Sequence, residues 1–127
     1  EFKHWFLGNK FTSTFVSVDD DDNVTDMISY YRLYNQLLKK NKKHKFIYTA
    51  YLFYYTSTTH TLYKLGLDML VMAKKENIDV VNATTIMENR IMIDSLNFTE
   101  GTGELYYYFL NWKCPDLKPS QIAKHCF

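Results

Sequence analysis

Cysteine is scarce in this chain. Two cysteines, Cys114 and Cys126, occur among the 127 residues, and they do not form a CxxC spacing. Small secreted domains that depend on disulfides carry more cysteines than this, so the cysteine content is typical of an intracellular protein. The first ten residues, EFKHWFLGNK, also lack the apolar segment and the small-residue cleavage site of a secretory signal. We therefore expect a cytoplasmic location.

Long apolar runs and a surplus of one charge are missing as well. No run of about 18 apolar residues is present, so no transmembrane segment is predicted. Lysine and arginine together number 15 and aspartate and glutamate 14, which gives a formal net charge of +1. This balance predicts no attraction of the whole molecule to nucleic acid or membranes. The local run KKNKKHK (Lys39–Lys45) leaves a membrane or nucleic-acid contact open, although a solvated surface loop is the simpler interpretation.

Short motifs that carry familiar chemistry are absent. The sequence contains no nucleophile elbow, no phosphate-binding glycine loop and no zinc-ligand spacing. The acidic cluster Asp19–Asp22 lacks the spaced ligands, the glycine and the closing glutamate of a calcium loop, so we interpret it as a solvated turn. We therefore expect no metal site, and the residues by themselves indicate no catalytic chemistry.

Apolar and aromatic residues, by contrast, are plentiful. They make up 46% and 17% of the chain, with eleven tyrosines, which is enough apolar material for one domain with a real core. Buried tyrosines need partners for their hydroxyl groups. The tyrosines therefore indicate either many half-buried positions or a groove lined with aromatic rings.

The hydrophobic pattern predicts an α+β fold with a mixed sheet and helices packed on it. Runs rich in β-branched and aromatic residues predict strands, and apolar spacings of three and four predict helices. The expected strands are Thr12–Val18, Val24–Leu33, Phe46–Thr56, Ile78–Ala83, Leu105–Trp112 and Ile122–Phe127, and the expected helical segments are Glu1–Leu7, Leu62–Lys75 and Met87–Leu96.

The segment NFTEGTGELYYYFLNWKCP (Asn97–Pro115) combines two glycines with three consecutive tyrosines. GTG is too short for a dinucleotide-binding fingerprint, so Gly101 and Gly103 are expected to form a turn that needs a positive φ. The apolar run that follows, Leu105–Trp112, is expected to be an interior strand that lies chiefly in the core.

Several blocks of the chain, taken in order, resemble one known family. The blocks are HWF, TDMISYYRL, AYLFYY, VMAKKENIDVVNA, MEN, LNFTEGTGELYYYFLNWKCP and the short tail after Pro115. Their order and spacing resemble the C-terminal half of eukaryotic glycylpeptide N-myristoyltransferase, over essentially all 127 residues. The resemblance implies an acetyltransferase-like (GNAT-like) half with a twisted mixed sheet. Residues 1–127 would be the peptide-binding half, with the acyl-CoA-binding half outside this chain, which agrees with the missing initiator methionine.

The resemblance also implies an activity. The family transfers myristoyl from myristoyl-CoA to the N-terminal glycine amine of proteins and peptides. This half would bind no cofactor, because myristoyl-CoA is held as co-substrate through the N-terminal half. The expected partners are therefore that half and peptides that begin with glycine. A non-catalytic peptide-binding fragment, or a degenerate half, is left open as the alternative.

Site residues follow from the same resemblance, one position at a time. Tyr31 and Tyr51 match tyrosines that line the peptide groove, and Asn82 matches an asparagine close to the bound N-terminal segment. Gly103 and Leu105 match the turn that borders the peptide beyond its first residues.

Four positions depart from the family pattern: Thr102, Asn35, and the pair Lys124 and His125, which interrupts a tail that is usually apolar. One main-chain group carries the chemistry. Thr102 stands where the family signature KFGxGDG has an aspartate that meets basic peptide residues, although Glu100 and Glu104 flank it. Asn35 stands where a serine that helps to read a substrate serine is frequent. The resemblance further implies that the main-chain carboxylate of Phe127 accepts a proton from the substrate's ammonium group.

Overall fold

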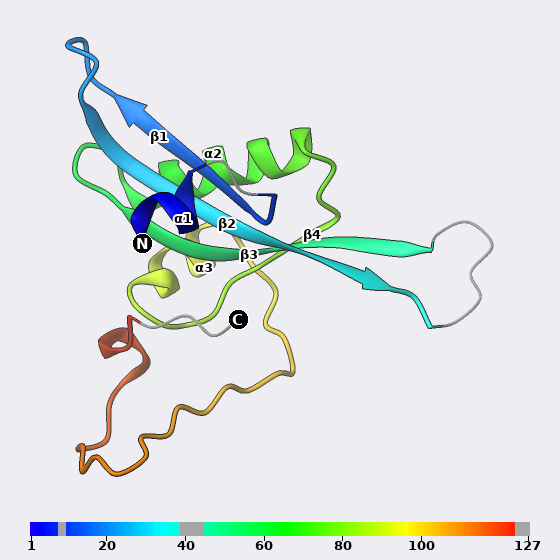
Figure 1. The fold of residues 1–127 in the computed structure, drawn as a ribbon, viewed down its shortest axis with the longest axis vertical. Helices are drawn as coiled ribbons and strands as arrows, with labels where there is room; N and C mark the ends of the chain where they lie inside the picture. Colours follow the sequence, from blue (N-terminus) through cyan, green and yellow to red (C-terminus); the bar gives the residue numbers. More distant parts are fainter. Residues whose placement is uncertain (8–9, 39–44, 124–127) are drawn as a thin grey trace.

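The structure is a computed structural model that describes residues 1–7, 10–38 and 45–123 (Figure 1). Its elements are α1 (Phe2–Phe6), β1 (Thr12–Val18), β2 (Val24–Gln36), β3 (Phe46–Thr56), α2 (Leu62–Lys75), β4 (Val80–Asn82), α3 (Asn89–Ser95) and the 3-10 helix η1 (Pro119–Gln121). The predicted bounds of β1, β3 and α2 are confirmed, and β2 continues beyond Leu33 to Gln36.

The four strands form one mixed sheet in the order β1-β2-β3-β4. β1, β2 and β3 pair antiparallel, whereas β4 pairs parallel with β3 because α2 carries the chain back across the sheet. The predicted mixed α+β architecture is therefore confirmed. Past the residues that pair with β1 and β4, β2 and β3 continue as a two-stranded ribbon that projects from the sheet (Figure 1).

The β1–β2 hairpin turns at the acidic cluster. The Oδ1 atom of Asp19 accepts hydrogen bonds from the backbone N–H groups of Asp21 and Asn23, at 3.0 and 2.8 Å, and Asp22 adopts a positive φ of 62°. Aspartate and asparagine tolerate such turns because their short side chains satisfy nearby backbone groups. The interpretation of this cluster as a solvated turn is confirmed.

α2 covers one face of the sheet and builds the core. Its buried apolar residues recur at helical spacing, and together with residues of β2, β3 and α3 they enclose the largest apolar cluster. This cluster comprises Ile28, Tyr30, Ala50, Leu52, Leu62, Leu65, Met69, Ala73 and Met92. Removing this surface from water is the main favourable contribution to the folding of the domain.

Hydrogen bonds fix both ends of α2. At its start, Thr61 Oγ1 accepts from the backbone N–H of Lys64 at 3.3 Å, as an N-cap does. At its end, Glu76 Oε2 accepts from the hydroxyl groups of Tyr30 and Ser13, at 2.7 and 2.8 Å. Burial and then the bond to Glu76 raise the pKa of Tyr30, so the phenol remains a donor that ties the helix to the sheet.

The predicted strand Leu105–Trp112 is wrong. Residues 101–118 form no strand or helix, and the side chains are exposed, for example Tyr108 at 87% and Leu110 at 90%. The apolar pattern predicted burial, but a strand also needs a neighbour to pair with its N–H and C=O groups. No strand of the described chain lies beside this segment to pair with its backbone groups. The segment therefore runs as an extended coil away from the sheet (Figure 1).

Other expectations near the C-terminus also need correction. Gly101 and Gly103 have ordinary φ values and open space where a Cβ would lie, so the left-handed turn expected at them is wrong. That conformation occurs at Asn97, with φ of 55°. The helix expected at Met87–Leu96 is the shorter α3, because Met87 has a φ of 53° that a helix excludes. Of the strand expected at Ile122–Phe127, residues 122 and 123 belong to no strand and residues 124–127 lie outside the described chain.

Candidate functional site

One row of side chains crosses the sheet on the face opposite α2. Strand pairing places Tyr31 beside Tyr51 and Tyr51 beside Asn82, and directly paired residues point to the same side. Their sequence neighbours Tyr30 and Ala50 alternate into the core under α2. The two tyrosine rings are stacked, with centroids 5.2 Å apart and an interplanar angle of 9°. Three residues that are far apart in the sequence therefore form one continuous row.

Asn35 lies on the same face, further along β2. It is four positions from Tyr31, so an even number of residues keeps both side chains on one side of the strand. Its side-chain amide donates to Thr49 Oγ1 on β3 at 2.9 Å. The sequence contained no indication of Thr49, because its contact with Asn35 depends on the register of two strands.

Aromatic side chains from the chain's beginning close one end of this face. Phe53 of β3 stacks on Phe6 of α1, with centroids 5.4 Å apart, and Trp5 of α1 packs edge-on against the same ring. Phe53 also meets Tyr31 edge-on at 5.9 Å. α1 was not expected in the site, although the aromatic pair in HWF could have suggested that this segment needs an apolar partner.

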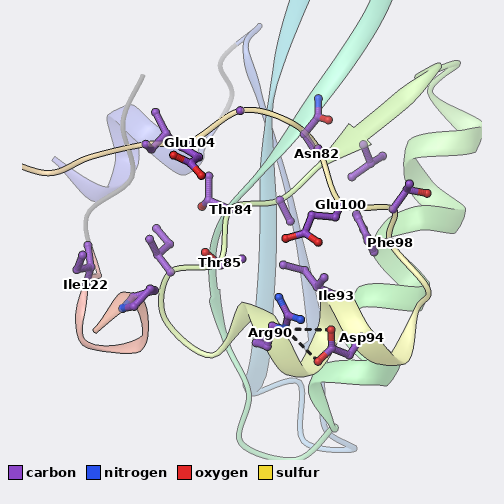
Figure 2. Close-up of a pocket in the computed structure, with 18 of the residues that line it drawn as sticks. Asn82, Thr84, Thr85, Arg90, Ile93, Asp94, Phe98, Glu100, Glu104 and Ile122 are labelled. Carbon is purple, nitrogen blue, oxygen red and sulfur yellow. Dashed lines mark hydrogen bonds and ion pairs between the residues drawn. The ribbon is translucent and has the colours of Figure 1, made fainter. Parts of the chain in front are cut away.

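A cavity of about 700 Å³ lies next to the row, between the β4–α3 segment, α3 and the C-terminal coil (Figure 2). Asn82 belongs both to the row and to the cavity wall, so the two features are continuous. Gly103 and Leu105 line the cavity, as the resemblance implies for residues that border the peptide. Thr102 is not among the lining residues and is exposed.

Acidic groups outnumber basic groups in the cavity wall. Among the described residues Arg90 is the single basic residue of the lining, and its Nε atom lies 3.1 Å from the carboxylate of Asp94. Glu100 lies between this ion pair and Asn82 (Figure 2), and Glu104 accepts a hydrogen bond from the hydroxyl of Tyr106, which raises the pKa of Tyr106. Because Arg90 already faces Asp94, the described part of the cavity wall has no further basic side chain to pair with Glu100 and Glu104 and carries negative charge.

The sequence of this chain matches one known protein family. Residues 1–125 match the model described as myristoyl-CoA:protein N-myristoyltransferase, C-terminal domain. The chain belongs to the N-myristoyltransferase family. It is 39% identical over 124 residues to the glycylpeptide N-tetradecanoyltransferase of Drosophila melanogaster, an alignment that covers 97% of this chain and 26% of that protein. The chain spans about a quarter of the length of the curated relatives it matches.

Solved structures agree with the family and with the fold. A Saccharomyces cerevisiae N-myristoyltransferase with bound myristoyl-CoA superimposes with a TM-score of 0.70 and 27% identity, over 79% of this chain and 28% of that one. An aminoglycoside 6′-N-acetyltransferase from Acinetobacter baumannii gives a TM-score of 0.54 at 15% identity, over 84% of this chain and 75% of that one. This chain therefore has an α+β fold of the acetyltransferase type.

The structure places most of the predicted site residues of this chain in one region. Tyr31, Tyr51, Asn82 and Asn35 share the open face of the sheet, and Gly103 and Leu105 lie on the wall of the adjoining cavity. Phe127 and positions 39–44 of the lysine run are outside the described residues. In the described part of the chain no cluster of three metal-binding side chains occurs, and no helix there has the length and apolar character of a membrane span.

Proposed function

We propose that this chain forms the peptide-binding part of an enzyme that transfers myristoyl from myristoyl-CoA to the N-terminal glycine amine of proteins. The match of residues 1–125 to the family's C-terminal domain carries the proposal. The geometry supports it, because one face of the sheet is lined with half-buried aromatic rings and continues into a cavity. In this proposal residues 1–127 are the peptide-binding half, and myristoyl-CoA is held by the part of the enzyme outside this chain.

The row of Tyr31, Tyr51 and Asn82 is the proposed floor of the peptide groove. Stacked tyrosines offer rigid apolar contact together with hydroxyl groups, and the amide of Asn82 can both donate to and accept from a peptide backbone. Gly103 and Leu105 would border the peptide where the groove meets the cavity. The negative wall there favours substrates with basic side chains, with Glu100 and Glu104 supplying charge that Thr102 lacks.

The proposed proton acceptor is the main-chain carboxylate of Phe127. An α-amino group has a pKa of about 8, so at neutral pH it is mostly protonated and does not attack a thioester. A carboxylate in a water-poor pocket is a stronger base than one in water, because desolvation raises its pKa. The proposal requires that the polypeptide of the enzyme end at Phe127.

Extension of the full-length enzyme by one glycine after Phe127 tests this role. The extension moves the carboxylate, so we expect turnover of a glycine peptide to be lost while myristoyl-CoA still binds, as measured by titration. Phe127→Leu is the matched control, because it changes the side chain and keeps the carboxylate in place. Normal turnover by the extended enzyme would remove Phe127 from the mechanism.

The groove itself is tested by Tyr51→Ala in the full-length enzyme. We expect KM for a glycine peptide to rise roughly tenfold, which corresponds to ~1.4 kcal/mol of lost binding, with kcat less affected. Tyr63→Ala is the control, since Tyr63 lies on α2 and is 47% exposed. If both substitutions leave KM unchanged, the open face of the sheet is not the groove.

A further inference from the structure

The outer end of the β2–β3 ribbon carries apolar and aromatic side chains that the described part of the chain leaves exposed. Past the residues that pair with β1 and β4, Tyr34 pairs with Tyr48 and Gln36 with Phe46. The exposed fractions of Tyr34, Phe46 and Tyr48 are 56%, 46% and 42%, and Leu38, just after β2, is 99% exposed. The ribbon projects from the sheet (Figure 1), so these side chains lie apart from the core beneath α2.

The exposed side chains lie on both faces of the ribbon. Leu33 is two residues from Tyr31, so it is directed to the face opposite α2, and it is 45% exposed. Tyr34 and its partner Tyr48 are directed to the α2 face, because Tyr48 is two residues from Ala50 in the core. A flat partner surface would cover one of these faces only. A medium that surrounds the end of the ribbon covers both.

The charge of this part of the chain has one sign. Residues 33–49 include five lysines and no aspartate or glutamate. The other ten basic residues are outnumbered by all 14 acidic residues, so the rest of the chain has a net charge of −4. Lys45, the one lysine of the five that lies within the described residues, is exposed, and its carbonyl accepts from the backbone N–H of Leu37 at 3.0 Å. An anionic partner therefore complements this end of the ribbon.

We propose that the end of the β2–β3 ribbon binds the surface of an anionic lipid bilayer. Leu33, Leu38 and Phe46 enter the boundary between headgroups and acyl chains, where apolar side chains leave water. The two tyrosines suit the same boundary, because each combines an apolar ring with a polar hydroxyl. The ammonium group of Lys45 stays among the anionic headgroups, while its apolar stem lies along the lipid.

Nucleic acid would also be attracted by the lysines, but it fits the exposed side chains less well. Single-stranded nucleic acid binds to aromatic rings with open faces, on which successive bases stack. The rings of Tyr34 and Tyr48 instead meet edge to face, with centroids 5.2 Å apart and an interplanar angle of 81°. Leu33 and Leu38 offer no partner to a phosphate group, whereas both leave water at a lipid boundary. The exposed side chains therefore favour a bilayer.

Cosedimentation of the full-length enzyme with vesicles tests the proposal, using phosphatidylcholine and phosphatidylserine at a ratio of about three to one and no acyl-CoA. We expect binding that weakens as salt rises, and little binding to phosphatidylcholine alone. Leu38→Ser should weaken binding to the mixed vesicles about tenfold, because the leucine no longer contributes apolar contact. Ile91→Ser is the matched control, since Ile91 lies on α3 and is an aliphatic residue of equal size that is 58% exposed. It should bind as the wild type does.

Lys45→Glu separates the contribution of charge from that of apolar contact. It should weaken binding to the mixed vesicles about fivefold or more at low salt, and this difference should shrink at high salt. Melting temperatures show whether each variant is folded.

Binding that Leu38→Ser and Lys45→Glu leave unchanged overturns the proposal, as does a wild type that does not bind the mixed vesicles at low salt. An equal loss in Leu38→Ser and Ile91→Ser would also overturn it, because the ribbon would then have no special part. Binding of the wild type to single-stranded RNA but not to the mixed vesicles would assign the ribbon to nucleic acid instead. None of these measurements involves acyl transfer, so their failure is distinct from a failure of the proposed function.

Discussion

At the scale of single residues, Asp26 of β2 has more side-chain hydrogen bonds than any other side chain in the described part of the chain. It is fully buried, and its carboxylate accepts from the backbone N–H groups of Thr58 and Thr59, at 2.7 and 2.9 Å. The Thr59 hydroxyl and the Nδ1 atom of His60, 2.8 Å away, also donate to it. Burial by itself would raise the pKa of Asp26, but these hydrogen bonds outweigh burial and hold the pKa far below its usual range. Asp26 thereby fixes the loop that leads into α2.

We predict that Asp26→Asn lowers the melting temperature of the full-length enzyme by several degrees at neutral pH. A carboxylate whose folded pKa is depressed contributes stability above its unfolded pKa of about 4, and this stability is lost as the pH falls below that value. The difference between wild type and variant should therefore shrink below about pH 4. Thermal unfolding across pH measures it. Asp20→Asn, in the exposed hairpin turn, is the control, and an equal effect of both substitutions would contradict the role of Asp26.

At the scale of elements, the sequence was sufficient to predict a helix or strand wherever its residue pattern was local and the element that it packs against lay within this chain. β1, β3 and α2 began and ended as predicted, because their periodicity is marked and turn or cap residues flank them. Gly66 lies in the middle of α2, where glycine is intrinsically unfavourable. The structure accounts for it, because a Cβ at this position would lie 2.6 Å from Met92 Cγ. A larger residue at this position would require the side chains of Met92 and Leu96 to move.

Elements whose structure depends on distant partners were not predictable. Leu105–Trp112 has the composition of an interior strand, yet it is extended coil because no described strand pairs with it. The site shows the same limit. The resemblance pointed to Tyr31, Tyr51 and Asn82 individually, but only the register of β2, β3 and β4 shows that they form one row. The hydrogen bond between Thr49 and Asn35 could not be found in advance, since it depends on a diagonal contact between two strands.

At the scale of the whole molecule, the exposed aromatic segment and the length of the chain both agree with our proposal that part of the enzyme lies outside this chain. Leu105, Tyr108, Leu110 and Trp112 are all more than half exposed, and large exposed apolar side chains gathered in one segment are typical of an interface. The chain spans about a quarter of its relatives' length. Our proposal that another part of the enzyme holds myristoyl-CoA provides a partner that could cover this segment.

We predict that Trp112 becomes buried when this chain is joined to the remainder of the enzyme. Trp5 and Trp112 are the two tryptophans of the chain, and Trp112 is 68% exposed, so Trp5→Phe leaves Trp112 as the chain's fluorophore. In the full-length enzyme, Trp5→Phe and its Trp112→Phe derivative give the Trp112 emission by difference. This emission should be shifted to shorter wavelength and be less accessible to acrylamide than in the isolated chain. The isolated chain should also show no turnover of a glycine peptide with myristoyl-CoA, because its residues supply no site for the thioester. Equal quenching of Trp112 in the two proteins would mean that the segment stays in water and that the remainder of the enzyme packs elsewhere.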